Sequence, residues 1–140
     1  MPESRISAKT RQRVAERANY CCEYCQAQER YSPDSFAVEH IHPIAKGGSN
    51  QLNNLAFACQ GCNNRKYTHT EALDPQSQTP APLYHPRQDQ WADHFQWSED
   101  YTQIQGLTPI GRATITQLHL NRSGLVNLRR LLIPTQEHPP

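Results

Sequence analysis

The chain has 140 residues, a hydrophobic content of 36 % and a formal net charge of +1. This length allows about one domain, or a small core with an extension, and a low apolar content with eleven prolines predicts a loop-rich chain that a metal could stabilise. No run of about 18 apolar residues occurs, which excludes a membrane span, and the N-terminus lacks the apolar core of a secretory signal. We therefore expect an intracellular, cytoplasmic protein.

The charge is unevenly distributed along the chain. Residues 1–70 carry nine Lys and Arg against six Asp and Glu, whereas residues 71–140 carry five against seven. The positive excess of the first half suits an anionic substrate, but an excess of this size does not by itself predict nucleic-acid binding.

The first predicted element is a helix over residues 7–18, where Ser7 can cap a run rich in Ala, Arg, Gln and Glu. Lys9, Arg13 and Arg17 recur every four residues and therefore share one face. This face either contacts phosphates or is an ordinary solvated surface, and the sequence leaves both interpretations open.

The central part of the chain predicts the order strand, loop, strand, helix. The first strand has aromatic or β-branched residues at alternating positions and ends before Pro43, and a flexible turn follows it. The predicted elements are a strand over 36–41, a turn over 46–50, a return strand over 52–58 and a helix over 63–71.

The second half predicts an extension of this core. Four prolines in residues 74–86 disfavour a helix and indicate an extended linker. A hairpin is expected over 91–107, then a helix over 110–120 capped by Thr108 and Pro109, and a short helix over 125–133. The expected organisation is a core over 1–72, a Pro-rich linker over 73–90, a hairpin with helices packing on the core over 91–134, and a disordered tail over 135–140.

Four of the five cysteines form two Cys-x-x-Cys pairs, and Cys21 lies outside this spacing. Each pair can supply two thiolates from one turn, and four thiolates make a closed tetrahedral zinc site whose role is structural. In a reducing compartment this pattern indicates a metal rather than disulfides, although redox pairs or unbound buried thiols are the alternatives. The predicted zinc ligands are Cys22, Cys25, Cys59 and Cys62.

Polar residues of a second kind lie between the cysteine pairs. Glu39 and His40 are adjacent on the first predicted strand, so a regular strand would point them to opposite faces. Asn54 follows fourteen residues after His40, and Asn63 comes directly after Cys62. Arg65 and Lys66 follow on the predicted helix.

These motifs, EHIHP, GGSNQLNNL and CQGCNNRK, together resemble the HNH endonuclease family, in its zinc-stapled, small bacterial type. The resemblance implies an α+β fold with a ββα-metal core, a structural four-cysteine zinc site and a C-terminal α/β extension. The stretch from Pro82 to Asn121 also resembles an extension found on small bacterial HNH proteins.

The resemblance also implies a role for each polar residue. His40 matches the general base, Glu39 and Asn63 match the metal ligands, and Asn54 matches the asparagine that braces the loop and orients the base. The motif is therefore His-Asn-Asn rather than His-Asn-His. Oxygen ligands favour a hard catalytic ion such as Mg²⁺, or Mn²⁺ or another divalent ion in its place.

The expected reaction is the hydrolysis of DNA phosphodiester bonds by a metal-dependent endonuclease, with double-stranded DNA as the substrate. A neutral His40 can accept a proton from water, and a divalent ion on Glu39 and Asn63 can bind the scissile phosphate. Arg65 and Lys66 are expected to contact flanking phosphates. The alternatives are a non-catalytic zinc-stapled DNA-binding module and a zinc scaffold for protein partners.

Overall fold

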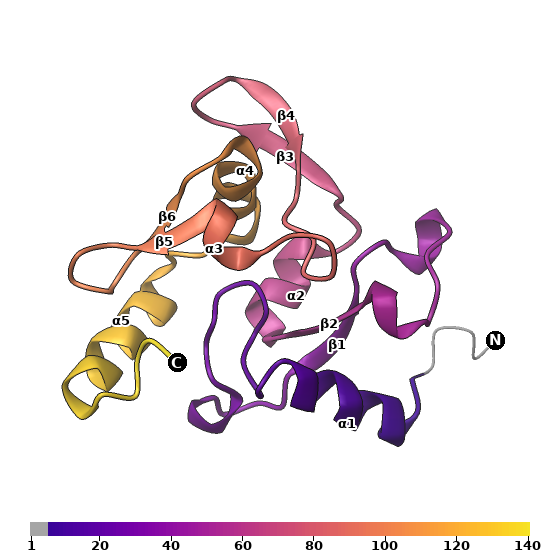
Figure 1. The fold of residues 1–140 in the computed structure, drawn as a ribbon, viewed down its shortest axis with the longest axis horizontal. Coiled ribbons are helices and arrows are strands. Elements are labelled where there is room, and N and C mark those ends of the chain that lie inside the picture. The colour runs from indigo at the N-terminus through magenta and orange to yellow at the C-terminus, as the bar shows by residue number, and fades with distance from the viewer. Residues whose placement is uncertain (1–5) are drawn as a thin grey trace.

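The computed structural model describes residues 6–140, so anything expected of residues 1–5 lies outside the described part. Within these described residues the fold is α+β, with helices and three two-stranded antiparallel sheets (Figure 1). A buried apolar core runs from the N-terminal helix through the first sheet to the C-terminal helices. Small separate sheets with one shared core agree with the loop-rich fold predicted from the composition.

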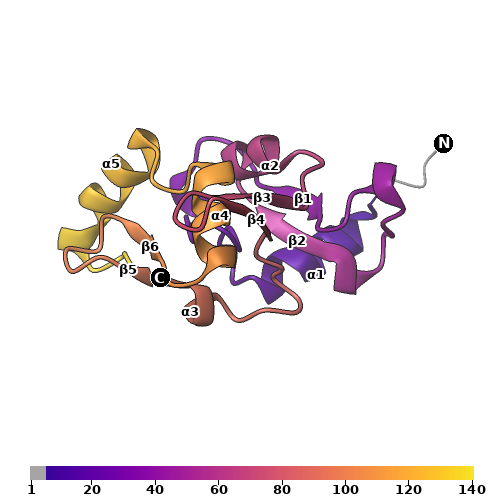
Figure 2. The ribbon, with the colours of Figure 1, turned by 90° about the horizontal axis from the view of Figure 1, so that it is seen from above.

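Helix α1 (Ala8–Arg17) confirms the first predicted element, and it lies against strand β2 (Figures 1 and 2). Its Ser7 cap accepts a hydrogen bond from the Thr10 backbone N–H at 3.1 Å. Its basic face is divided, because Lys9 and Arg13 are exposed while Arg17 donates to the carbonyl oxygens of Leu52 and Leu55. Arg17 therefore holds α1 on the chain that leads into β2.

The expected strand–loop–strand–helix unit is present. Strand β1 (Ala37–His40) pairs with β2 (Leu55–Ala58), and helix α2 (Gln60–Lys66) follows directly. The helix starts three residues before the predicted range, because Cys59 is its N-cap and its sulfur accepts from the Cys62 backbone N–H. The second Cys-x-x-Cys pair thus lies at the first turn of the helix.

The expected Pro-rich linker contains a hairpin instead, formed by β3 (Glu71–Asp74) and β4 (Thr79–Pro82). Prolines are tolerated there because a two-stranded sheet leaves the outer edge of β4 without a partner that needs its N–H groups. Asp74 stabilises the turn by accepting from the Gln76 backbone N–H, and both its carboxylate oxygens accept from Arg112 at about 3 Å. Alternation alone could not show this long-range support.

The last part of the chain confirms the expected hairpin and two helices. Strands β5 (Phe95–Trp97) and β6 (Ile104–Gly106) pair, and a short helix α3 (Trp91–His94) that the sequence did not predict precedes them. Thr108 caps helix α4 (Pro109–Leu118) by accepting from Gly111, and helix α5 (Ser123–Leu132) follows.

The C-terminal tail, expected to be disordered, packs on the protein. Glu137 forms an ion pair with Arg30. The ring of His138 packs edge-on against that of Trp97, with the two ring centroids 4.5 Å apart. Arg30 lies more than a hundred residues before Glu137, and Trp97 lies about forty residues before His138. No local pattern in the sequence could therefore indicate these contacts. Within the described residues no helix has the length and apolar character needed to cross a membrane.

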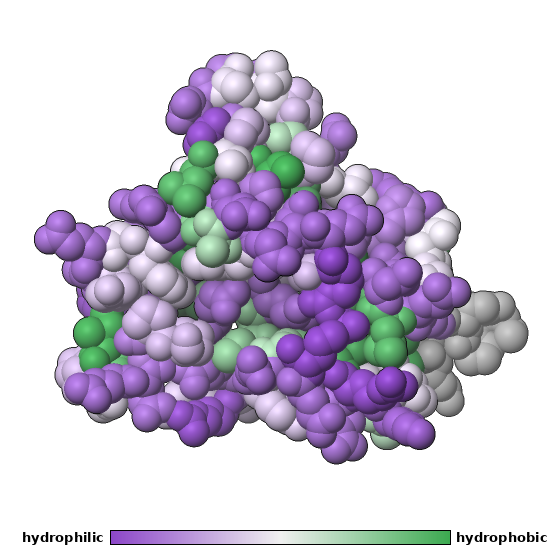
Figure 3. Space-filling view, in the orientation of Figure 1, coloured by the Kyte–Doolittle hydropathy of each residue, from purple (hydrophilic) through white to green (hydrophobic). Residues whose placement is uncertain are grey.

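The surface in Figure 3 is mainly hydrophilic, with apolar side chains in small separate areas. This agrees with the mean hydropathy of −0.84. Most large apolar side chains are instead buried in one core that joins the first sheet to the C-terminal helices. This core determines how the two halves of the chain pack together.

Candidate metal centre and active site

The four predicted cysteines come together in one buried cluster, and their sulfur atoms all lie within 4.8 Å of one another. The sulfurs of Cys25 and Cys59 are 3.7 Å apart. A tetrahedral zinc ion with Zn–S bonds of about 2.3 Å places its sulfurs about 3.8 Å apart. The cluster therefore has the ligand type, number and spacing of a structural zinc site.

Two matching turns hold the sulfurs in place. The Cys22 sulfur accepts from the Cys25 backbone N–H at 3.4 Å, and the Cys59 sulfur accepts from the Cys62 N–H at the same distance. Burial raises the pKa of the Cys22 thiol, whereas hydrogen bonds from the other three sulfurs lower the pKa of the Cys59 thiol. A divalent ion would stabilise all four as thiolates, which is the form that binds zinc.

Cys21 stands apart from this cluster, as its spacing predicted. It is half-buried, and its sulfur lies 3.5 Å from the Asn19 carbonyl oxygen. Its sulfur is not part of the group that could hold a metal ion, and burial raises the pKa of its thiol, so it is not an activated thiol.

His40 lies at the end of β1 and its ring is half-buried. Its Nε2 is 2.7 Å from Oδ1 of Asn50, in the loop that joins the two strands. Because an amide oxygen only accepts hydrogen bonds, the neutral ring carries its proton on Nε2, and Nδ1 has a free lone pair. No residue of the described range 6–140 donates to that nitrogen.

Asn54 closes the same loop from its other side. Its Oδ1 accepts from the His42 backbone N–H, and its Nδ2 donates to the carbonyl oxygens of His42 and Ser49. Gly48 lies so close to the His42 carbonyl that a Cβ there would be only 1.8 Å from the oxygen. These contacts fix the loop that carries Asn50, the hydrogen-bond partner of His40.

Glu39 points into the protein, on the opposite face of β1 from His40. The residue is 4 % exposed, and Oε1 accepts a 2.6 Å hydrogen bond from the hydroxyl of Tyr24. Its Oε2 lies 2.7 Å from Nζ of Lys66, an ion pair without hydrogen-bond geometry, and it is the one buried side-chain oxygen or nitrogen of residues 6–140 that lacks a hydrogen bond. The ammonium group of Lys66 therefore occupies the position beside this oxygen, and a divalent ion bound there would have to replace it.

Lys66 is 1 % exposed and also donates to the Ile41 carbonyl oxygen at 2.8 Å. This burial differs from the expected contact with phosphate, because the ammonium group is turned towards Glu39 and away from solvent. Arg65 is exposed, and its guanidinium group donates to the Gly61 carbonyl oxygen at 3.3 Å, so the side chain can also meet an anion from solvent. Asn63 is half-buried and lies three residues before Lys66, so the two share a face of α2.

A comparison with known families identifies this part of the chain. Residues 22–69 match the family model described as HNH endonuclease. This segment is therefore similar to HNH endonucleases over residues 22–69. No curated protein and no solved structure matches the chain. The HNH segment contains both cysteine pairs, the β1–β2 sheet and α2, whereas the hairpins and helices that follow lie outside it.

Three supporting residues were not found from the sequence. Tyr24 and Asn50 contact the predicted residues Glu39 and His40, and Arg122 donates to two of the cysteine sulfurs. Tyr24 lies between the first two zinc-ligand cysteines, where the sequence suggested only a turn. Each contact joins parts of the chain that are at least ten residues apart, so spacing within a motif could not reveal it.

Proposed function

We propose that this chain is a metal-dependent endonuclease that hydrolyses DNA phosphodiester bonds, with His40 as the general base. The orientation of His40 carries the proposal. Asn50 fixes the proton on Nε2, so Nδ1 is an unprotonated nitrogen that can accept a proton from an attacking water. A histidine that served only packing would not need an oriented acceptor held by the loop.

Glu39 and Asn63 would hold the catalytic divalent ion. The donor set consists of carboxylate and amide oxygens, which suit Mg²⁺ or Mn²⁺, and such an ion would take the place of the Lys66 ammonium, which lies 2.7 Å from Glu39 Oε2. Such an ion, when bound, supplies charge stabilisation for the scissile phosphate and the leaving oxygen. Arg65 at the surface of α2 would contact a flanking phosphate, while Lys66 balances the charge of Glu39 from inside.

A non-catalytic DNA-binding module is the second candidate, and one observation favours it. Lys66 already neutralises Glu39, so the carboxylate has a cationic partner without any divalent ion. In that case the HNH segment would keep its shape and its exposed Arg65, and it would bind DNA without hydrolysis.

Plasmid cleavage separates the two candidates. The purified chain is incubated with supercoiled plasmid and Mg²⁺ or Mn²⁺ beside His40→Ala, with His69→Ala as a control that removes an exposed histidine of the same segment. We expect the His40 variant to cleave about 10²–10⁴-fold more slowly, the range for loss of a general base, and the His69 variant to match the wild type. Plasmid binding with no His40-dependent cleavage under either ion would reject the enzyme and favour the module.

A further inference from the structure

The zinc cluster receives a positive charge from outside the HNH segment. Arg122 lies in the turn between α4 and α5, sixty residues beyond Cys62, and its guanidinium group donates to two of the cysteine sulfurs. The distances are 3.4 Å from Nη2 to the Cys59 sulfur and 3.7 Å from Nη1 to the Cys62 sulfur. Both are hydrogen-bond distances for a sulfur acceptor.

The guanidinium group is held in this position by the extension itself. Its Nη1 also donates to the carbonyl oxygens of Leu118 and His119, each at 3.2 Å, at the end of α4. The Leu118 carbonyl is one of those that a helix leaves without an intrahelical partner at its C-terminus, and the His119 carbonyl also accepts from the Arg122 backbone N–H. The same side chain therefore satisfies the end of α4 and two cysteine sulfurs.

Gly61 makes this approach possible. A Cβ at this position would lie 2.4 Å from Nη2 and 3.0 Å from Cζ of Arg122, closer than non-bonded atoms can come. The absence of a side chain in the first turn of α2 thus leaves the space in which the guanidinium group reaches the sulfurs. A glycine inside a helix is otherwise unfavourable compared with alanine.

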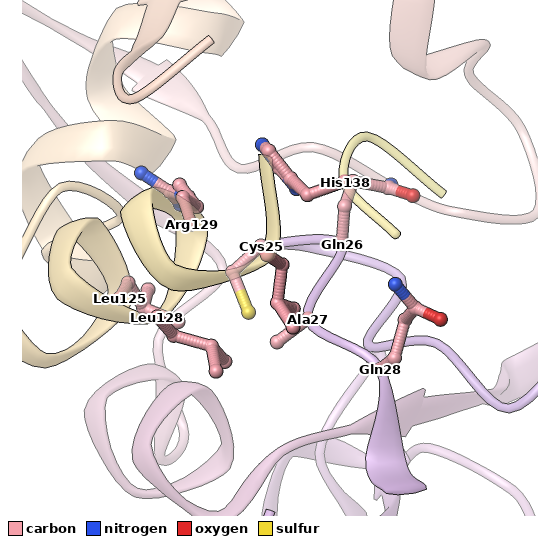
Figure 4. A pocket seen from close by; sticks show the side chains of 9 residues that line it. Cys25, Gln26, Ala27, Gln28, Leu125, Leu128, Arg129 and His138 are labelled. Atoms are coloured by element: carbon pink, nitrogen blue, oxygen red, sulfur yellow. The ribbon is translucent and has the colours of Figure 1, made fainter. Parts of the chain in front are cut away.

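Helix α5 packs on the other cysteine pair as well. Leu125, Leu128 and Arg129 of α5 face Cys25 and the residues after it across a small cavity (Figure 4). Leu125 and Cys25 are both buried. The extension therefore contacts both halves of the cluster, by charge at the second cysteine pair and by apolar packing at the first.

A zinc ion with four thiolates carries a net charge of −2, which is unfavourable in a buried site unless positive charge or hydrogen bonds offset it. Partners outside the ligand set commonly change metal affinity by 10- to 100-fold. We propose that Arg122 is a positioning residue of the zinc site, so that docking of the C-terminal extension and retention of zinc are coupled.

Zinc release from the full-length, zinc-loaded protein tests this coupling. Excess chromogenic chelator captures the released metal, and the rate is compared for wild type, Arg122→Gln, Arg122→Lys and the control Arg130→Gln, which removes an exposed arginine of α5. We expect Arg122→Gln to release zinc 10- to 100-fold faster, Arg122→Lys to fall between, and Arg130→Gln to match the wild type. Equal release rates for wild type and Arg122→Gln would overturn the proposal.

Gly61→Ala provides a second test that keeps the charge of Arg122. If Arg122 had no role at the cluster, alanine in a helix would leave zinc retention unchanged or improve it. We expect faster release instead, because the new methyl group displaces the guanidinium group. The double variant should release zinc no faster than Arg122→Gln, since both changes remove the same contact, and additive effects would contradict the proposal.

Discussion

The two candidate metal centres of the HNH segment differ in how their ligands are held. At the cysteine cluster, four buried sulfurs lie within 4.8 Å of one another, and backbone N–H groups of both turns orient them. At the other centre, the oxygens of Glu39 already contact Tyr24 and Lys66, and His40 contacts Asn50. The first centre presents four sulfurs with the spacing that one zinc ion needs, whereas the charge of the second is balanced by protein groups.

This difference follows from the chemistry of the ligands. Thiols are weak hydrogen-bonding groups, so four buried sulfurs gain little from one another and much from a zinc ion. A buried carboxylate differs from a buried thiol, because an unpaired buried charge is strongly destabilising even before a metal ion binds. Glu39, the proposed ligand of the divalent ion, therefore has a partner of its own in Lys66.

The largest effect should come from the cysteine cluster. We expect Cys59→Ser, or removal of zinc by a chelator, to unfold the HNH segment, because structural zinc contributes about 10–16 kcal/mol in small zinc domains and whole proteins are stable by about 5–15 kcal/mol. Far-UV circular dichroism with metal analysis measures the loss, and Cys21→Ser is the matched control. A Cys59→Ser chain that folds normally without zinc would show that the cluster is not a staple.

Removal of Lys66 should give the next largest effect, at the second centre. Lys66→Met leaves Glu39 buried without its cation, which costs about 3–5 kcal/mol in buried pairs, whereas Lys46→Met removes an exposed charge and should cost little. Urea unfolding measures both. If Glu39 binds a divalent ion, Mn²⁺ should restore part of the stability of Lys66→Met. No such recovery would favour the DNA-binding module.

The sequence predicted the cysteine cluster better than the surroundings of Glu39, because the cysteine pairs are local and the contacts of Glu39 are not. Cysteine spacing reports the zinc site because each pair forms its own local turn, and the structure brings the four sulfurs together as predicted. The surroundings of Glu39 depend on contacts between separate elements, such as the contact between β1 and Lys66 of α2. A basic residue after the second cysteine pair suggested a phosphate contact, and only the packing of α2 shows that Lys66 is buried.

The fold shows the same division. Helices α1 and α4 were predicted because Ser7 and Thr108 cap them, and a cap is a local device. The β3–β4 hairpin was predicted as a linker because its prolines are unfavourable locally, while its support comes from Arg112 on α4. Local chemistry could be predicted from the sequence, and support from distant residues could not.

The Asp74–Arg112 ion pair links two separate elements, β3 and α4, as the zinc site links the two cysteine pairs, but it does so without a metal. Arg112 lowers the pKa of Asp74. A carboxyl group whose pKa is lowered on folding adds stability that is complete above its ordinary pKa, about 4, and disappears as the pH falls through the folded value. We expect Asp74→Asn to lower the urea midpoint at pH 7 and to flatten the loss of stability below pH 4.

Chelator should act on Asp74→Asn as it does on the wild type, because the pair and the cluster are separate. The matched control is Asp93→Asn, an exposed carboxylate in α3. A midpoint for Asp74→Asn that equals the wild type at pH 7 would show that the pair adds no stability.

The smallest effect concerns the orientation of His40 and bears most directly on catalysis. Asn50→Ala removes one hydrogen bond to the ring, worth about 1 kcal/mol, so we expect plasmid cleavage to slow by about fivefold with little change in stability. Asn53→Ala, at an exposed position of the same loop, is the control. Asn50→Asp keeps the acceptor and adds a negative charge that favours the protonated ring, so its cleavage should require a higher pH than the wild type. Unchanged pH dependence in Asn50→Asp would mean that the ring bonded to Asn50 is not the base, and only the structural role of the loop would remain.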